Sequence, residues 1–155
     1  MRVLRTALEQ AATEARAALP REIGGILVGD RLGEHAVQVH ALRRVEDRAA
    51  TSSSYRRAHS EASRQLASAR RAGGEGTTLG YVGEWHSHPS PSGPSGRDAS
   101  ELRAISSQLD GPAVLLVLSF TQPSSPPNLH AMACVAGSVA EASVVIVDQH
   151  PVGPE

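Results

Sequence analysis

Hydrophobic residues recur at every third or fourth position in three stretches of the chain, and this spacing predicts helices. The first stretch, residues 2–19, is rich in alanine and stops at a proline. The second, residues 55–72, mixes Arg, Ala and Glu and is followed by a glycine-rich break. The third begins at Ser95 and is stopped by a Gly-Pro pair. We therefore expect about three helices.

Shorter apolar runs predict the strands of a sheet. They cover residues 26–29, 36–45, 77–86, 113–120, 129–136 and 139–147. The first two runs flank a polar turn and predict a hairpin. The fourth and fifth are almost continuously apolar, which is typical of strands covered by helices on both faces. Together the runs predict an α/β fold, a mixed β-sheet flanked by helices.

The length of the chain, 155 residues, predicts a single domain over residues 1–155, with residues 149–155 as a flexible tail. Basic and acidic residues nearly balance, and the net charge of -1 argues against nucleic acid or an anionic membrane as partner. The longest apolar run is far shorter than the roughly 20 residues of a membrane helix. No signal segment follows Met1, so we expect a cytoplasmic protein.

Cysteine usage restricts the kinds of metal site that the chain can form. Cys134 is the single cysteine of the sequence, which excludes an internal disulfide and every metal site built from several cysteines. A metal ion would therefore have to bind to His and carboxylate side chains.

His86-Ser87-His88 lies at the end of a predicted strand, where alternate residues face the same side. Both imidazoles can therefore reach one point, and Asp98 can join them from the first turn of the following helix. Two nitrogens and one carboxylate oxygen suit Zn²⁺ and leave a fourth position for water, as in catalytic zinc sites. Bound zinc would lower the pKa of that water to about 7 and polarise a carbonyl group.

Each of these residues also has a purely structural explanation. A His-x-His pair on a strand is common by chance. Ser95 and Asp98 fit a capping box that starts a helix, and such a box does not exclude metal binding. Glu22, taken alone, would be expected to be a solvated residue after a helix stop.

Three short motifs, taken together, resemble those of a known family. Glu22-Ile-Gly-Gly-Ile-Leu-Val-Gly29 is followed by Trp85-His-Ser-His-Pro89 and by Ser95-Gly-Arg-Asp98. In this order, and in a strand, loop and helix context, they resemble the JAMM (JAB1/MPN+/Mov34) metalloproteases, particularly the small prokaryotic members. The resemblance covers roughly residues 22–120.

The resemblance implies a cytidine-deaminase-like α/β fold of the JAB1/MPN type. It implies that His86, His88 and Asp98 bind zinc. It further implies that Glu22 holds the catalytic water as general acid and base, and that Ser95 helps to stabilise the oxyanion. Six residues separate His88 from Ser95, one fewer than the commonest spacing in the family.

Glu84 has two further interpretations. In a regular strand residues 84, 86 and 88 share one face, so Glu84 could be a partner of His86 or a rival of Glu22 as the base. We prefer Glu22, because the Gly-Gly pair after it allows the backbone to approach the site closely. Ser87, between the two histidines, is expected to hydrogen-bond nearby backbone or the site.

A function also follows from the resemblance. It implies a zinc metalloprotease that hydrolyses the isopeptide or peptide bond after the C-terminal glycine of a ubiquitin-like protein, in deconjugation or in precursor processing. Bacterial enzymes of this kind act beside E1- and E2-like proteins in conjugation systems, including anti-phage defence operons. Three alternatives stay open: a sulfur-carrier-processing peptidase, a small-substrate amidase, and a metal-free MPN scaffold that only binds partners.

Overall fold

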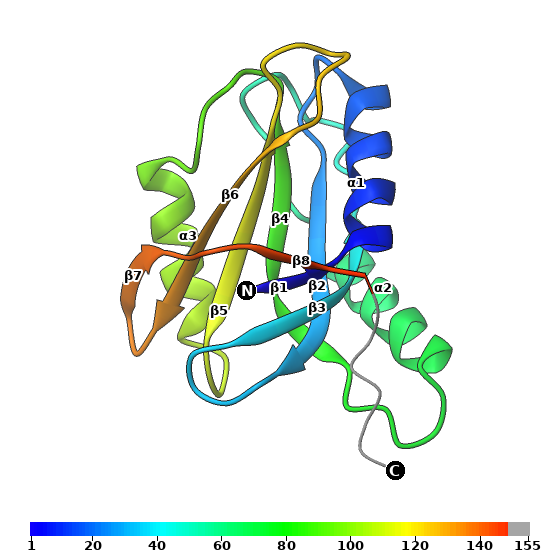
Figure 1. Ribbon diagram of the computed structural model, residues 1–155, viewed down its shortest axis with the longest axis vertical. Helices are drawn as coiled ribbons and strands as arrows, with labels where there is room; N and C mark the ends of the chain where they lie inside the picture. The colour runs from blue at the N-terminus through cyan, green and yellow to red at the C-terminus, as the bar shows by residue number, and fades with distance from the viewer. Residues whose placement is uncertain (149–155) are drawn as a thin grey trace.

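Eight strands form one mixed sheet in the computed structural model, which describes residues 1–148 (Figure 1). The strands are β1 (Arg2–Leu4), β2 (Gly24–Arg31), β3 (Val37–Arg44), β4 (Gly80–His88), β5 (Ala113–Ser119), β6 (Asn128–Val135), β7 (Ser138–Glu141) and β8 (Val145–Val147). Within the same residues, the helices are α1 (Arg5–Ala18), α2 (His59–Ala72) and α3 (Gly96–Ser106). The expected mixed sheet with about three helices is therefore confirmed, whereas the expected tail lies outside the described residues.

β4 lies in the middle of the sheet, and the two edges of the sheet curl toward each other. The strand order is β7-β6-β5-β4-β2-β3-β1-β8, with β4 antiparallel to β2 and parallel to β5. Residues 142–144 connect the two edge strands, β7 and β8. A connection of this length spans at most about 14 Å. The two edges must therefore approach each other, and Figure 1 shows this segment crossing in front of the other strands.

The helices cover the two faces of the sheet differently. α1 packs on one face, where Leu8 and Ala15 join a core with Leu27, Trp85 and Leu116. On the other face α2 lies over β2 and β3, and α3 lies over β5 and β6. The second half of β4 runs between α3 and the segment that leads into α2, and these parts line one cleft. Outward residues of β4 thereby form the floor of the cleft.

The first helix begins later than the sequence predicts. Residues 2–4 form β1 instead of the start of a helix, and this part of the prediction is wrong. The physical reason is long-range pairing: β1 is parallel to both β3 and β8, and Val3 and Leu4 are buried. Within residues 1–148, none of the helices is long and apolar enough to cross a membrane.

The second helix also begins later, at His59, so the expectation of helix over residues 55–58 is wrong. Tyr55 donates a hydrogen bond to the backbone carbonyl of Val45 at 2.8 Å. Arg57 forms an ion pair with Glu84 of β4. These contacts hold the segment in an extended path that a helix could not follow.

Most of the predicted strands are present, with changes at their ends. β2 and β3 form the expected antiparallel hairpin, and every residue of β5 is buried as expected. β4 begins and ends later than the predicted strand over 77–86. β6 is only partly buried, so the expectation of two covered faces is wrong for it. Residues 139–147 do not form one strand, because the chain leaves β7 and pairs with β1 at the opposite edge.

Gly25 and Gly96 offer a matched pair of substitutions that test the packing of β2 on β3. A Cβ atom at Gly25 would lie 1.8 Å from the carbonyl oxygen of Arg43, whereas one at Gly96 would meet nothing within 4 Å. We expect Gly25→Ala to lower the free energy of unfolding by at least about 2 kcal/mol, and Gly96→Ala to leave it unchanged or raise it slightly. Urea unfolding followed by circular dichroism measures both values. Equal stabilities of the two variants would contradict the close approach of the strands.

Candidate functional site

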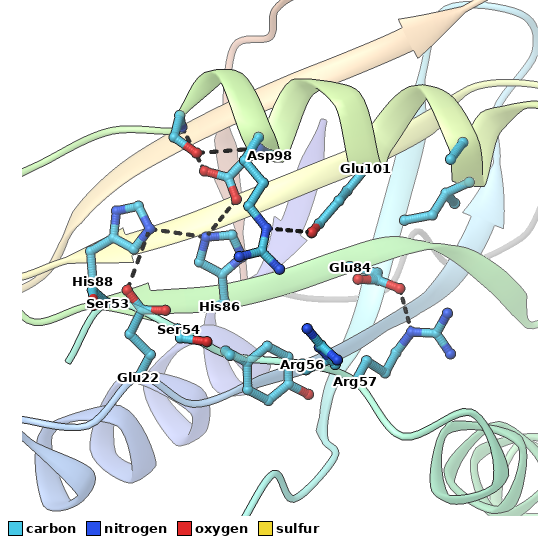
Figure 2. Close-up of a pocket in the computed structure, with 15 residues that line it drawn as sticks. Glu22, Ser53, Ser54, Arg56, Arg57, Glu84, His86, His88, Asp98 and Glu101 are labelled. Carbon is cyan, nitrogen blue, oxygen red and sulfur yellow. Dashed lines mark hydrogen bonds and ion pairs between the residues drawn. The ribbon is translucent and has the colours of Figure 1, made fainter. Parts of the chain in front are cut away.

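The two histidines of the His-x-His motif lie on the same side of β4. Trp85 and Ser87, which alternate with them, are buried. The Nε2 atoms of His86 and His88 lie 3.0 Å apart, and the exposed fractions of the two side chains are 13% and 12%. Two nitrogen donors therefore converge at the end of β4 (Figure 2).

Asp98 reaches the histidines from the first turn of α3. The hydroxyl oxygen of Ser95 accepts the backbone N–H of Asp98 at 3.2 Å, and Oδ2 of Asp98 accepts the backbone N–H of Ser95 at 2.5 Å. This capping box occupies one carboxylate oxygen, while the other, Oδ1, lies 3.4 Å from Nε2 of His86. The same two residues thus begin the helix and complete the cluster.

The surroundings of both imidazole rings suit metal binding. Nδ1 of His88 lies 2.9 Å from the backbone carbonyl oxygen of Ser92, which can only accept, so Nδ1 carries the proton. In the neutral ring Nε2 then presents its lone pair to the cluster. Burial lowers the pKa of His86 to about 4, against a smaller opposing effect of the Asp98 carboxylate. His86 is therefore neutral near pH 7.

Glu22 lies beside the cluster, just before β2. Gly24 of β2 pairs with His86 of β4 in an antiparallel register. Two residues before Gly24 therefore lie opposite two residues after His86, which puts Glu22 opposite His88. Oε1 of Glu22 lies 4.0 Å from Nε2 of His88, and 10% of the Glu22 side chain is exposed. Burial raises the pKa of the Glu22 carboxyl group, and His88 partly offsets this. Such a carboxyl group is suited to accept and return a proton.

The His-His-Asp cluster fits the requirements of zinc. One nitrogen of each histidine and one oxygen of Asp98 all lie within 4.8 Å of one another. Ligands at about 2.0–2.1 Å from a tetrahedral zinc ion are about 3.3 Å apart. The two separations that involve His86, 3.0 Å to His88 and 3.4 Å to Asp98, are close to that value. Three ligands of this kind leave one coordination position open.

Ser87 connects the two halves of the site. Its hydroxyl oxygen accepts the backbone N–H of Ile23 at 3.0 Å, and its own N–H donates to the Ile23 carbonyl at 2.7 Å. Because Ile23 follows Glu22, this pair of bonds fixes the segment with the acid against the strand with the histidines. The expectation that Ser87 hydrogen-bonds nearby backbone is confirmed.

Glu84 lines the same cleft but has other partners. Its Oε1 accepts the hydroxyl of Tyr81 at 3.1 Å and pairs with Nε of Arg57. Figure 2 draws this contact between Glu84 and Arg57. Glu84 therefore links β4 to the segment before α2, and it does not belong to the metal cluster.

The cluster opens into a cleft of about 320 Å³. One wall is α3 and the other is the segment 53–57. Gly24 lets this segment approach, because a Cβ atom on it would lie 2.8 Å from the Tyr55 ring and 2.9 Å from Cβ of His86. Sequence reasoning missed the segment as part of the site. Its position depends on contacts with Val45 and Glu84, for which the local sequence carries no signal.

Comparisons with known proteins agree with the fold described above. The model of the family of prokaryotic homologs of the JAB domain matches residues 4–145. The solution structure of a Desulfitobacterium hafniense protein aligns over 99% of this chain and 97% of that chain, with 22% identity and a TM-score of 0.67. A Salinibacter ruber protein, also solved in solution, aligns over 100% and 95%, with 24% identity and a TM-score of 0.60. The crystal structure of a JAB1/MPN domain protein from Archaeoglobus fulgidus aligns over 96% and 100%, with 19% identity and a TM-score of 0.52. No curated protein matches the sequence.

Metal binding can be tested without any assumption about activity. We expect the protein to bind about one zinc ion per chain, because three donors converge and leave one position open. His88→Ala and Asp98→Asn should each lower the affinity at least about tenfold. His35→Ala, which removes an exposed histidine of the β2–β3 turn, is the matched control and should not change it. Titration calorimetry measures these affinities, and equal values in all variants would contradict the site.

Ser87→Ala tests the connection between Glu22 and the histidines. The change leaves the buried N–H of Ile23 without its partner, and we expect a loss of about 1–3 kcal/mol in the free energy of unfolding. Ser100→Ala is the control, because the Ser100 hydroxyl only donates to Gly96 of its own helix. Urea unfolding compares the two. A loss no larger than that of the control would show that the Ser87 bond contributes nothing.

Proposed function

Because the chain belongs to the prokaryotic homologs of the JAB domain, we propose that it is a zinc-dependent metallopeptidase. The observation that carries the proposal is the place of Glu22, whose carboxyl group has a raised pKa and lies 4.0 Å from Nε2 of His88. A structural zinc site would be closed by four protein ligands, with no need for such an acid. The substrate that we propose is the isopeptide or peptide bond after the C-terminal glycine of a ubiquitin-like protein.

Zinc would be held by Nε2 of His86, Nε2 of His88 and Oδ1 of Asp98. When bound, it supplies a Lewis acid for a carbonyl oxygen and lowers the pKa of water. Hydrogen bonds behind the ligands orient them: Ser92 accepts from the ring of His88, and the backbone N–H of Ser95 donates to Asp98. Partners of this kind usually strengthen a metal site and fix the tautomers of its ligands.

Glu22 acts as the general base and then as the general acid in this proposal. It accepts a proton from the attacking water and returns it to the nitrogen of the leaving amine. The amine then departs uncharged, which is far easier than departure as an anion. Burial beside His88 supports this role, because it moves the pKa of the carboxyl group toward neutral pH, where acceptance and return are both efficient.

Ser95 provides a donor for the oxyanion that forms on the carbonyl oxygen. Its oxygen already accepts the backbone N–H of Asp98, so its hydroxyl hydrogen is available to another acceptor. Ser95 lines the same cleft as His86 and Glu22. We propose that this hydroxyl stabilises the oxyanion by a hydrogen bond.

A glycine-ended tail suits the shape of the cleft. The floor is β4, and α3 and the segment 53–57 form two walls. An extended chain fits between such walls most easily where it has no side chains, because glycine lets the backbone approach closely. The same hydrolysis would serve deconjugation and precursor processing. E1- and E2-like proteins are then the partners that we propose for making the conjugates.

Glu22→Gln and Glu84→Gln separate the two candidate bases. We expect Glu22→Gln to keep about one zinc per chain and to lower kcat at least about a hundredfold, because the proton acceptor is lost. Glu84→Gln should change kcat less than about tenfold. The assay measures cleavage of a carrier protein joined by Gly-Gly to a reporter, with small amides compared in parallel. No cleavage by zinc-loaded wild type would favour a binding scaffold, and faster cleavage of small amides would favour an amidase.

A further inference from the structure

The cleft continues from the metal cluster along a set of charged side chains. They are Arg56, Arg57, Glu84, Arg97 and Glu101. Arg57 pairs with Glu84, and Arg97 pairs with Glu101 at 2.8 Å. Within residues 1–148, no carboxylate lies within ion-pair distance of the Arg56 side chain. The guanidinium of Arg56 is thus left without an ion-pair partner in the part of the chain that the structure describes.

The backbone that carries Arg56 is held on both sides. Its own N–H donates to Oδ2 of Asp47 at 2.7 Å. The residue before it, Tyr55, is tied to Val45, and the residue after it, Arg57, is tied to Glu84. Figure 2 shows Arg56 beside Arg57 among the residues that line the cleft. The guanidinium is therefore attached to a fixed base although its end is exposed.

We propose that Arg56 determines specificity by binding an acidic side chain of the substrate, close to the bond that is cut. The inference rests on the proposed peptidase function and adds the charge of the substrate to it. A guanidinium offers several N–H donors in a planar fork that matches a carboxylate. A substrate carboxylate at this place would give Arg56 the ion-pair partner that no side chain within residues 1–148 supplies.

A basic substrate residue would find no equivalent partner in the same part of the cleft. Glu84 is engaged by Arg57 and Tyr81, and Glu101 is engaged by Arg97. The carboxylates of Glu22 and Asp98 belong to the metal cluster and its acid. A lysine or arginine of the substrate would therefore meet Arg56 and be repelled, so the cleft discriminates by attraction and by repulsion.

Binding of labelled peptides tests the inference. Each peptide has a central Gly-Gly pair, and Glu, Gln or Lys occupies in turn each nearby position on either side of it. Fluorescence anisotropy measures the dissociation constant of each peptide from the zinc-loaded Glu22→Gln variant, which is used because the substitution prevents cleavage. At low salt we expect, for one of the positions, that the peptide with Glu binds about fivefold more tightly than the peptide with Lys. This ratio of dissociation constants should shrink as salt is added.

Charge reversal gives the decisive comparison. In the Glu22→Gln background, Arg56→Glu should reverse the preference to Lys, Arg56→Ala should abolish it, and Arg56→Lys should keep part of it. Arg71→Glu, on the exposed surface of α2, changes the net charge equally and is the matched control. An unchanged Glu-to-Lys ratio in Arg56→Glu, or an equal change in Arg71→Glu, would overturn the assignment. Circular dichroism checks that every variant is folded.

Cleavage of the same peptides by the wild-type protein separates this inference from the proposed function. Peptides that bind with the expected preference but stay uncut would contradict the peptidase and support the role of Arg56. Peptides that are cut with no preference among Glu, Gln and Lys would support the peptidase and contradict the role of Arg56.

Discussion

Two imidazole nitrogens held 3.0 Å apart, largely shielded from water, are the constraint on which the site depends. Two lone pairs at this distance would repel each other, so either the N–H of one neutral ring points at the other nitrogen or a cation lies between them. The sheet fixes the backbone of both histidines, because β4 is paired with β2 on one side and β5 on the other. The carbonyl of Ser92 adds a second restriction by keeping the proton of His88 on Nδ1. The metal binding and the proton transfer at Glu22 that we propose both depend on this arrangement.

The residues of the cluster could be predicted from sequence because each is placed by a local rule. Alternation along a strand puts His86 and His88 on one side, and a capping box puts Asp98 in the first turn of α3. The capping box was also the competing explanation, and the structure shows that the two are one arrangement. One carboxylate oxygen of Asp98 caps the helix while the other faces His86. The expected fold followed in the same way from periodicity and from the resemblance of three motifs.

What could not be predicted depends on contacts between distant segments. The local sequence predicts helix at residues 2–4 and 55–58. The first segment instead pairs as a strand with β3 and β8, and the second is held in an extended path by contacts with Val45 and Glu84. Similarly, one apolar run divides into β7 and β8, because the curled sheet brings its two edges within reach of a short connection. Local preference is worth only a few tenths of a kcal/mol per residue, and strand pairing or a half-buried ion pair overrides it easily.

Residues placed by local rules and residues placed by contacts between distant segments lie in different parts of the site. The chemical groups lie on β4, on the start of α3 and before β2, where strand register and helix capping place them. The opposite wall of the cleft is the segment 53–57. Its path is set by a tyrosine bonded to Val45, just after β3, and by an arginine paired with Glu84 of β4. Because loops of this kind change without disturbing a sheet or a helix start, substrate preference can vary while the cluster stays the same. Arg56 lies on this wall, so the substrate preference that we propose would be set by the segment 53–57 and not by the metal cluster.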